Sequence, residues 1–343
     1  MTKLIIGGAG FIGINLAEYY AKRSERVIIF DNFSRKGSLE NAKWLASVYP
    51  NVEVIRGDIT TDFELLKKQI DLGVSAVYHL AAQVAVTTSV RDPRIDFEIN
   101  ALGSFNVLEA ARVASEPPII FYSSTNKVYG GMEEIEIIDR GHAYGYANLP
   151  NGISESVCLD FHSPYGCSKG SADQYFRDYA RIYGLKTVVF RQSCIYGERQ
   201  FGIEDQGWVA WFTIAAIIGK PITIYGDGKQ VRDVLYVQDL IRAFDMAYQR
   251  IDVTAGKIYN IGGGSPNAMS LLQLLEYLRL DIRQKINVEY SDWRPGDQKV
   301  YISDCTKAKF EFGWEPVISP REGVKSLLRW IQDNQETVRK MFP

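Results

Sequence analysis

Tyr165 and Lys169 are the residues whose types and spacing best suit chemistry in this chain. In Tyr165-Gly-Cys-Ser-Lys169 the two side chains lie four positions apart, so on a helix they would share one face, one turn apart. An ammonium group beside a phenol favours the phenolate, and a tyrosine that normally titrates near ~10 can then act as a base nearer neutrality. Pro164, directly before the tyrosine, suits the first position of a helix. The pair therefore predicts a general base.

A second pair with the same spacing, Tyr225 and Lys229, encloses the sequence Gly226-Asp227-Gly228. Glycines in that position oppose a helix, so these two side chains need not meet. The first pair is the better candidate.

Three consecutive hydroxyl side chains, Ser123, Ser124 and Thr125, end a strand-like run upstream of the pair. Open α/β sheets bind their ligands at the carboxyl ends of their strands. A threonine there suits a hydrogen bond to a reacting hydroxyl and the passage of its proton. The alternative is a Ser/Thr-rich turn, and the Tyr165–Lys169 pair favours the catalytic interpretation.

Gly7, Gly10 and Gly13 form a G-x-x-G-x-x-G pattern between the first predicted strand and the first predicted helix. Glycine allows a tight turn and close backbone approach, and the following helix offers unpaired N–H groups to a pyrophosphate. Asp31 follows the second strand, roughly where a carboxylate would accept the ribose hydroxyls of a dinucleotide. A carboxylate repels a 2′-phosphate, which favours NAD over NADP, although Arg35 lies nearby and Asp31 could instead cap a turn. Asp58, after the third strand, suits an adenine contact or a helix N-cap.

The elements that must position these residues alternate between strand and helix. The predicted strands are Lys3–Ile6, Arg26–Phe30, Val52–Arg56, Ala76–Leu80, Ile119–Ser123 and Thr187–Arg191, and the predicted helices are Phe11–Lys22, Phe63–Leu72, Pro93–Ala114 and Pro164–Tyr183. This alternation predicts an α/β fold, a Rossmann-type doubly wound parallel sheet covered by helices on both faces. Residues 130–163 break the rhythm and predict a long functional or disordered loop.

Two units are expected in a chain of 343 residues. Residues 1–191 would form the NAD-binding Rossmann domain, with part of 230–265 returning to it. Residues 192–343 would form mainly a smaller C-terminal α/β substrate-binding lobe, which includes a terminal helix near 321–334.

Composition excludes several classes of partner. Lys plus Arg (39) nearly balance Asp plus Glu (41), which argues against nucleic-acid binding. No apolar run reaches the ~18 residues of a membrane-spanning helix, and without an export signal a cytoplasmic protein is expected. The cysteines and histidines are too scattered for a disulfide framework or a metal site: Cys158, Cys167, Cys194 and Cys305, with His79, His142 and His162.

Taken together, the motifs resemble the extended short-chain dehydrogenase/reductases over nearly the whole chain. They occur in the family's order: the glycine turn, Asp31, Asp58, Leu80-Ala81-Ala82, Asn100, Ser-Ser-Thr…Val-Tyr-Gly, Tyr165 with Lys169, and Arg191…Tyr196-Gly197. The resemblance implies NAD as cofactor, Thr125, Tyr165 and Lys169 as the catalytic group, and Asn100 as support for a proton relay. The cofactor-binding residues it implies are Gly7, Gly10, Phe11, Ile12, Gly13, Asp31, Asn32, Asp58, Ile59, Leu80, Ala81, Ala82, Asn100, Tyr165 and Lys169.

The same resemblance narrows the reaction. Family members that dehydrate sugars carry an Asp-Glu pair after the catalytic threonine, whereas this chain has Asn126 and Lys127 there, which disfavours dehydration. Residues 124–130, 160–169 and 199–208 look most like 2-epimerases of CDP-linked sugars. Such enzymes oxidise C2 with tightly held NAD, let the 2-keto sugar rotate, and return the hydride to its other face. The alternatives are a GDP-glucose/GDP-mannose 2-epimerase, a UDP-sugar 4-epimerase and, from another class, a non-catalytic NAD-binding regulator.

Substrate contacts are expected for a nucleotide-diphosphate sugar that is CDP- or GDP-linked. The resemblance places Arg232 and Arg294 near the diphosphate, where a guanidinium fork suits phosphate oxygens, although each alone could be a surface arginine. Cys194 stands where many relatives have asparagine, so it either opens space for sugar rotation or is a buried structural thiol. The remaining candidates are Ser124, Asn126, Lys127, His162 and Arg199.

The resemblance also implies a homodimer held by a four-helix bundle. Residues 93–114 and 164–183 correspond to its helices. Packing of these helices on the sheet alone would equally explain their apolar faces.

Overall fold

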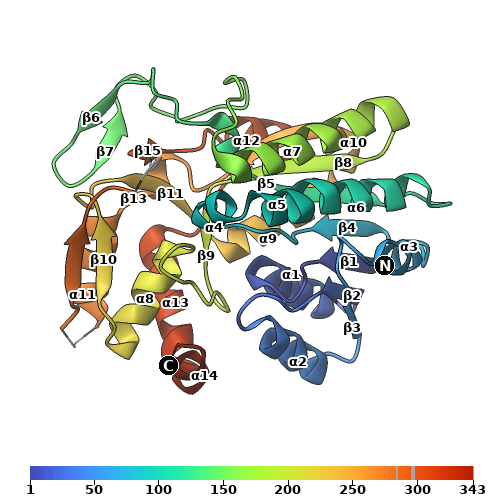
Figure 1. The fold of residues 1–343 in the computed structure, drawn as a ribbon, viewed down its shortest axis with the longest axis horizontal. Helices are drawn as coiled ribbons and strands as arrows, with labels where there is room; N and C mark the ends of the chain where they lie inside the picture. The colour runs from blue at the N-terminus through green and yellow to red at the C-terminus, as the bar shows by residue number, and fades with distance from the viewer. Residues whose placement is uncertain (283–284, 295–297, 343) are drawn as a thin grey trace.

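A seven-stranded parallel sheet forms the centre of the molecule in a computed structural model, which describes residues 1–282, 285–294 and 298–342 (Figure 1). Its strands, in order across the sheet, are β3 (Val52–Arg56), β2 (Arg26–Asp31), β1 (Thr2–Ile6), β4 (Ala76–His79), β5 (Ile119–Thr125), β8 (Thr187–Gln192) and β12 (Lys257–Ile261). Every neighbouring pair runs parallel. The predicted doubly wound Rossmann-type sheet is therefore confirmed.

The strands are apolar because both faces of the sheet are covered. Leu4, Ile5 and Ile6 of β1 are fully buried, and alternate residues join different core clusters. One face packs on α1 (Phe11–Ala21), α2 (Ser38–Val48), α9 (Val237–Gln249) and α12 (Thr306–Phe312). The other packs on α3 (Phe63–Ile70), α6 (Gly103–Arg112) and α7 (Ser163–Tyr183).

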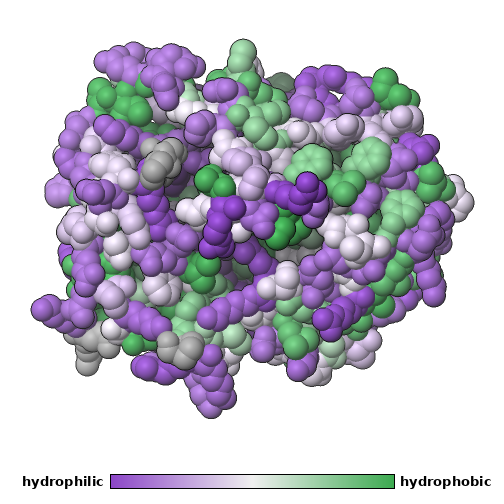
Figure 2. Space-filling view, in the orientation of Figure 1, coloured by the Kyte–Doolittle hydropathy of each residue, from purple (hydrophilic) through white to green (hydrophobic). Residues whose placement is uncertain are grey.

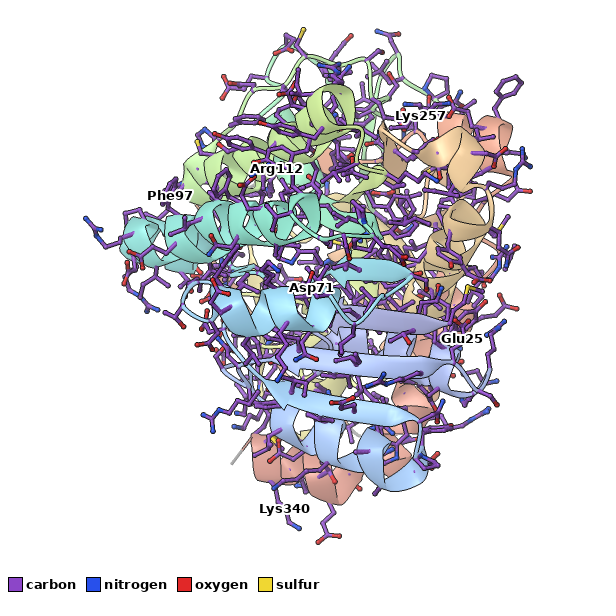
Figure 3. The ribbon with its side chains drawn as sticks, turned by 90° about the vertical axis from the view of Figure 1, so that its right-hand side faces the viewer. Glu25, Asp71, Phe97, Arg112, Lys257 and Lys340 are labelled. Atoms are coloured by element: carbon purple, nitrogen blue, oxygen red, sulfur yellow. The ribbon has the colours of Figure 1, made fainter. Side chains whose placement is uncertain are left out.

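The strand order reverses direction between β1 and β4, which is where open α/β sheets bind ligands, beyond the carboxyl ends of the strands. Figure 3 helps to orient these ends: Glu25, just before β2, and Lys257, which begins β12, lie toward the same side of the molecule and mark the amino ends. The carboxyl ends lie on the opposite side, which is the face seen in Figure 1.

The predicted helix over residues 93–114 contains an irregular turn. It is built from α5 (Pro93–Phe97), a π-helical turn η1 (Glu98–Leu102) and α6. Such turns often occur at functional sites. Several helices near the sheet were not predicted, among them α2, α4 (Val86–Arg91), α9 and α12.

Residues 130–163 form a loop that carries a short antiparallel hairpin, β6 (Ile137–Asp139) with β7 (Tyr144–Tyr146). Its apolar side chains share a core cluster with Val128, Val231 and Tyr301. The segment is therefore ordered by contacts with distant parts of the chain.

A second lobe lies beside the sheet. It contains β9 (Cys194–Tyr196), α8 (Trp208–Ile218), β10 (Ile222–Tyr225), β11 (Val231–Tyr236), β13 (Ala268–Ser270), α11 (Leu271–Asp281), β14 (Val288–Ser291), β15 (Val300–Tyr301), α13 (Pro320–Asp333) and α14 (Gln335–Met341). Its core is a cluster centred on α8, α11 and α13. Among the described residues, no helix combines the length and apolar character needed to cross a bilayer.

Candidate active site

Two adjoining pockets form one cleft at the carboxyl ends of the strands. The first, here the glycine pocket, is lined by the glycine turn, Asp31 and Asp58. The second, the catalytic pocket, is lined by Thr125, Tyr165 and Lys169. The two share Phe11, Ile12, Leu80, Ala82, Val84 and Gln206. Figure 2 shows a hollow near the middle of this face.

The glycine turn lets its own backbone pack closely. Gly7 has a φ of +76°, and a Cβ there would lie 2.5 Å from the Ala81 nitrogen. A Cβ on Gly13 would lie 2.4 Å from the Gly7 oxygen. At Gly10, which lines the pocket, the nearest such contact is 3.3 Å, and no side chain caps the start of α1. The turn therefore leaves the N-terminus of α1 open toward the pocket, which fits a pyrophosphate group.

Asp31 is fixed at the end of β2 by two backbone N–H groups. Ala9 donates to its Oδ2 at 3.0 Å and Phe33 donates to its Oδ1 at 2.8 Å. Burial raises the pKa of this carboxyl, while hydrogen bonds from the backbone of Phe33, Ala9 and Gly10 oppose the rise. Each oxygen keeps a lone pair for a further donor, so the turn-capping role is compatible with binding of a ribose diol.

Asp58 is held by hydrogen bonds from Thr60, two residues along the chain, and from Asn32, which follows β2. Its Oδ1 accepts from the Thr60 nitrogen at 2.8 Å, and its Oδ2 accepts from Asn32 Nδ2 at 2.8 Å. Burial opposes ionisation, but the hydrogen bonds from Asn32 and Thr60 outweigh it and lower the pKa of Asp58. The N-cap of α3 is Asp62, so Asp58 is not the helix cap.

The predicted catalytic residues meet in the second pocket. Thr125 ends β5, and α7 presents Tyr165 and Lys169 one turn apart on the face that lines the pocket. Ser89 accepts a hydrogen bond from the Tyr165 backbone nitrogen at 3.2 Å and so ties the start of α7 to α4. The Lys169 Nζ lies 4.3 Å from the centre of the Tyr122 ring.

Burial disfavours the charged form of both members of the pair. It raises the pKa of Tyr165 to about 12, although a hydrogen bond with Thr125 lowers it. It lowers the pKa of Lys169 to about 7, although Asp173 and Asp96 raise it. The sequence led us to expect a Tyr165 pKa drawn toward neutrality by Lys169, and the cleft by itself does not produce this. The physical reason is that both charged forms, the ammonium and the phenolate, lose their hydration in a pocket that excludes water.

A buried ion pair lies behind the catalytic lysine. The Arg191 Nη2 and Asp173 Oδ1 atoms are 2.9 Å apart, and both side chains are almost fully buried. Ser124, predicted to contact the substrate, lines the pocket but donates its hydroxyl to Asp173 Oδ2 at 2.7 Å. Asp173 lies one turn beyond Lys169 on α7, so this pair sets the charge around the lysine.

Asn100 lies outside both pocket linings and is fully buried in the π-helical turn. Its Nδ2 contacts Ser168 Oγ at 3.2 Å and the Gln83 carbonyl at 3.0 Å, and its Oδ1 accepts from the Gln83 nitrogen at 2.9 Å. The side chain therefore joins α7 to the segment after β4. It braces the site from behind.

The phosphate-side candidates Arg232 and Arg294 both line the catalytic pocket. Arg294 pairs with Asp205 at 3.0 Å, and its guanidinium lies 3.8 Å from the Tyr225 ring centre. Residues 295–297, which follow it in the motif, lie outside the described residues.

Cys194 lines the same pocket and accepts a hydrogen bond from Trp208 Nε1 at 3.4 Å. Burial raises the pKa of its thiol, which keeps the group neutral. Asn126 and Lys127 also line this pocket.

Two predicted substrate contacts lie away from the cleft. His162 is exposed at the N-cap of α7 and is absent from both pocket linings. The Arg199 guanidinium lies 3.1 Å from the centre of the Trp44 ring, and stacking on an indole competes with phosphate binding for a guanidinium. In the rejected second pair, Tyr225 donates to Glu204 and Lys229 donates to Asp139, so each side chain has its own partner.

Several lining residues were not identified from the sequence: Val84, Thr87, Gln192, Gln200, Gln206 and Trp208. Trp208 stood in a segment that carried the family resemblance, which was a usable signal. Gln200 and Gln206 stood in the same segment, whereas Gln192 ends β8 with no distinctive spacing, so no local signal marked it.

Comparison with known proteins finds relatives that match nearly the whole chain. The family model described as GDP-mannose 4,6 dehydratase matches residues 4–327. A curated CDP-paratose 2-epimerase from Salmonella typhi is 44% identical over 335 residues, which cover 96% of this chain and 99% of that protein.

Solved structures agree. The UDP-glucose 4-epimerase of Thermotoga maritima, with UDP-glucose, superposes with a TM-score of 0.83 at 32% identity, covering 98% of this chain and 100% of that one. The UDP-glucuronic acid 4-epimerase of Bacillus cereus, in complex with UDP-glucuronic acid and NAD, superposes with a TM-score of 0.83 at 27% identity, covering 97% and 99%.

Proposed function

The chain belongs to the GDP-mannose 4,6-dehydratase family of extended short-chain dehydrogenase/reductases, and from that membership we propose that it is an NAD-dependent 2-epimerase of a nucleotide-diphosphate sugar of the CDP-paratose/CDP-tyvelose type. The family is one of NAD-dependent epimerases and dehydratases, so the chain is an enzyme whose cofactor is NAD. The observation that carries the proposal is the convergence of Thr125, Tyr165 and Lys169 in a cleft continuous with the glycine pocket.

The residues of the glycine pocket fit NAD. The open N-terminus of α1 suits the pyrophosphate, and the Asp31 carboxylate suits an adenosine ribose that bears no 2′-phosphate. When bound, NAD supplies a hydride acceptor that can return the same hydride, so no cofactor is consumed.

Tyr165 is the group that removes and returns the proton of the sugar hydroxyl. Its hydrogen bond with Thr125 gives a path between that hydroxyl and the phenol. Lys169 stabilises the phenolate as it forms, provided that it carries its proton. The same groups serve both directions, since the second half of an epimerisation is the reverse of the first on the other face of the sugar.

Dehydration is disfavoured by the charges around the catalytic threonine. Among the described residues that line the catalytic pocket, Asp205 is the single acidic side chain, and it pairs with Arg294. Asn126 Oδ1 lies 3.3 Å from Thr125 Oγ1, where an amide offers neither an acid nor a base. Loss of water from a keto sugar needs both, whereas epimerisation at C2 needs one proton shuttle.

The test is to incubate the purified protein, without added NAD, with CDP-paratose or CDP-tyvelose in deuterated water, and separately with GDP-mannose, GDP-glucose and UDP-glucose. NMR of the sugar ring protons should show inversion at C2 of the CDP-sugar without deuterium at that carbon. Inversion at C2 of a GDP-sugar would change the nucleotide base of the proposed substrate from cytosine to guanine. Inversion only at C4 would overturn the 2-epimerase assignment.

Tyr165→Phe separates an enzyme from a non-catalytic NAD-binding regulator. The variant should lose roughly 10²–10⁴-fold in turnover because it lacks the proton shuttle. Its NAD content should match that of the wild type, measured on the denatured protein. Turnover within a few-fold of wild type would remove Tyr165 from the catalytic role.

A further inference from the structure

Residues 198–207, here the strap, leave the second lobe after β9 and return to it at α8. Along the way the strap contacts the sheet domain at separate points. The Glu198 carbonyl accepts a hydrogen bond from Asn15 Nδ2 of α1 at 3.0 Å. A Cβ on Gly37 would lie 2.3 Å from the Phe201 ring, so the residue before α2 must be small for that ring to pack.

Arg199 contacts aromatic rings of both units. Its guanidinium carbon lies 3.1 Å from the centre of the Trp44 ring on α2 and 6.0 Å from that of Trp330 on α13. Its φ of +64° is unusual for a residue other than glycine. A backbone held in that region indicates that the surrounding contacts determine the conformation.

The strap ends at the cleft. Ile203 and Gln206 exchange two backbone hydrogen bonds of 2.9 Å, which close a tight turn. Gln206 lines both the glycine pocket and the catalytic pocket, and its Oε1 accepts from Arg35 Nη2 at 3.4 Å. Arg35 itself lines the glycine pocket, so this contact joins the strap to the wall of that pocket.

We propose that the strap retains NAD, with Arg199 as a positioning residue that holds the strap against Trp44 and with Gln206 and Arg35 closing the glycine pocket. The reason for such a device rests on the proposed function. An epimerase must keep its reduced cofactor beside the keto sugar until the hydride returns, because loss of the cofactor at that stage leaves the enzyme without its reductant. Arg199, which the sequence predicted to contact the substrate, acts through the strap.

The experiment measures NAD retention, which needs no substrate. Wild type, Arg199→Ala and Arg199→Lys are purified with their NAD, transferred to buffer containing an NAD-degrading enzyme, and sampled over time for NAD still bound. Arg199→Ala should lose NAD at least tenfold faster than wild type. Arg199→Lys should be intermediate, because an ammonium also attracts an aromatic ring but does not stack as a guanidinium does.

Arg23→Ala is the matched control. That guanidinium carbon lies 3.5 Å from the Tyr19 ring centre, a stack of the same kind, but Arg23 lines neither pocket. Its NAD retention should equal that of wild type. Gln206→Ala provides a second test that leaves the Trp44 stack in place, and it should lose NAD severalfold faster. It carries the test alone if Arg199→Ala does not fold.

Retention in Arg199→Ala and Gln206→Ala equal to that of wild type would overturn the proposal. The proposal would also be overturned if wild type lost NAD as fast as Arg199→Ala does. The same holds if Arg23→Ala accelerated the loss of NAD as much as Arg199→Ala. The result is independent of the sugar. If wild type retains NAD through the strap but epimerises no substrate, the proposed function fails and the strap stands. Epimerisation with strap-independent retention would instead support the proposed function and remove the role of the strap.

Discussion

Lys169 and Tyr165 share one buried site, and catalysis needs their pKa values to shift in opposite directions. Tyr165 is more useful as its pKa falls and Lys169 is more useful as its pKa rises, yet burial moves each the other way. The Asp173 and Asp96 carboxylates compensate part of this for the lysine. The remainder must come from the bound ligands, since catalysis near neutrality needs a charged Lys169. Functional sites commonly accept such a cost in stability.

Replacing Lys169 by methionine should abolish turnover and increase the free energy of unfolding of the cofactor-free protein at pH 6. At that pH the lysine is charged both folded and unfolded, so the folded state bears the full cost of burying the ammonium. As the pH rises above about 7 the folded lysine loses its proton, while the unfolded lysine keeps its own until near 10.5. The advantage of the variant should therefore shrink by on the order of 2 kcal/mol between pH 6 and pH 9.

Urea unfolding of wild type and Lys169→Met at the two pH values measures this difference. The comparison cancels the other titrating groups that the two proteins share. A difference that is the same at both pH values would show that the lysine is not held at a depressed pKa in the folded cleft.

Asp173→Asn should destabilise the protein by about 3–5 kcal/mol, because it leaves the buried Arg191 guanidinium without its counter-charge. Glu315→Gln is the matched control. It removes one partner of the ion pair with Lys309, whose side chains are 64% and 53% exposed, and should cost only about 0–1 kcal/mol. Denaturant unfolding of the two variants tests the contrast, and equal losses would contradict the importance of burial for the Arg191 pair.

At the scale of elements, the glycines of the glycine turn have two different roles, which the sequence pattern does not distinguish. One role is packing within the turn, and the other is leaving the pocket open. A Cβ on Gly13 meets backbone atoms of Gly7 and Gly8 at 2.4 and 2.6 Å, whereas a Cβ on Gly10 approaches the Gly7 oxygen no closer than 3.3 Å. Gly13 thus serves the packing of α1 on the turn. Gly10 faces the space in which NAD would lie.

Gly13→Ala should therefore lower the stability of the cofactor-free protein by about 1–3 kcal/mol, the usual cost of forcing atoms into packed structure. Gly10→Ala should leave that stability nearly unchanged and instead weaken NAD binding. Thermal unfolding without NAD and titration with NAD distinguish the two effects. The same loss of stability in both variants would show that Gly10 is also a packing residue.

The strands of the sheet and the catalytic pair were predictable because their signals are local. Apolar runs such as Leu4–Ile6 must be buried on both faces, and Tyr165 and Lys169 share a helix. The π-helical turn at Asn100 was not predictable, since one extra residue in a turn leaves the apolar pattern almost unchanged. Arg199 stacks on Trp44, far away in sequence, and a guanidinium suits an indole and a phosphate equally well until the fold brings one of them near.

At the scale of the whole molecule, the cleft lies between two units that are held together at several points. Arg294 of the second lobe, and Asp205 and Gln206 of the strap, line pockets that also include Phe11 and Leu80 of the sheet domain. Neither unit alone encloses both pockets. The proposed chemistry therefore depends on the placement of the second lobe as much as on Thr125, Tyr165 and Lys169.

Exposed apolar side chains form a surface on the helices α5, α6 and α7, beside the sheet and on the side away from the second lobe. Figure 2 shows hydrophobic side chains gathered over this region, and Figure 3 shows Phe97 at its outer edge. Monomeric proteins rarely expose large contiguous apolar patches. Its exposed members are Val90, Ile95, Phe97, Leu102, Phe105, Val113, Tyr175, Ile182 and Tyr183. We expect a second copy of the chain to cover it, through the helices α5–α6 and α7.

Phe97→Glu tests that expectation, because a charge within an apolar interface cannot be buried without a partner. Wild type should have twice the 38.8 kDa mass of one chain at micromolar concentration, and the variant should have the mass of one chain. Phe310→Glu is the matched control, since Phe310 is 88% exposed but lies on α12, away from this surface. Its mass should equal that of wild type. A wild-type mass of one chain, or dissociation caused equally by Phe310→Glu, would contradict an interface on α5–α7, and light scattering on all three proteins distinguishes these outcomes.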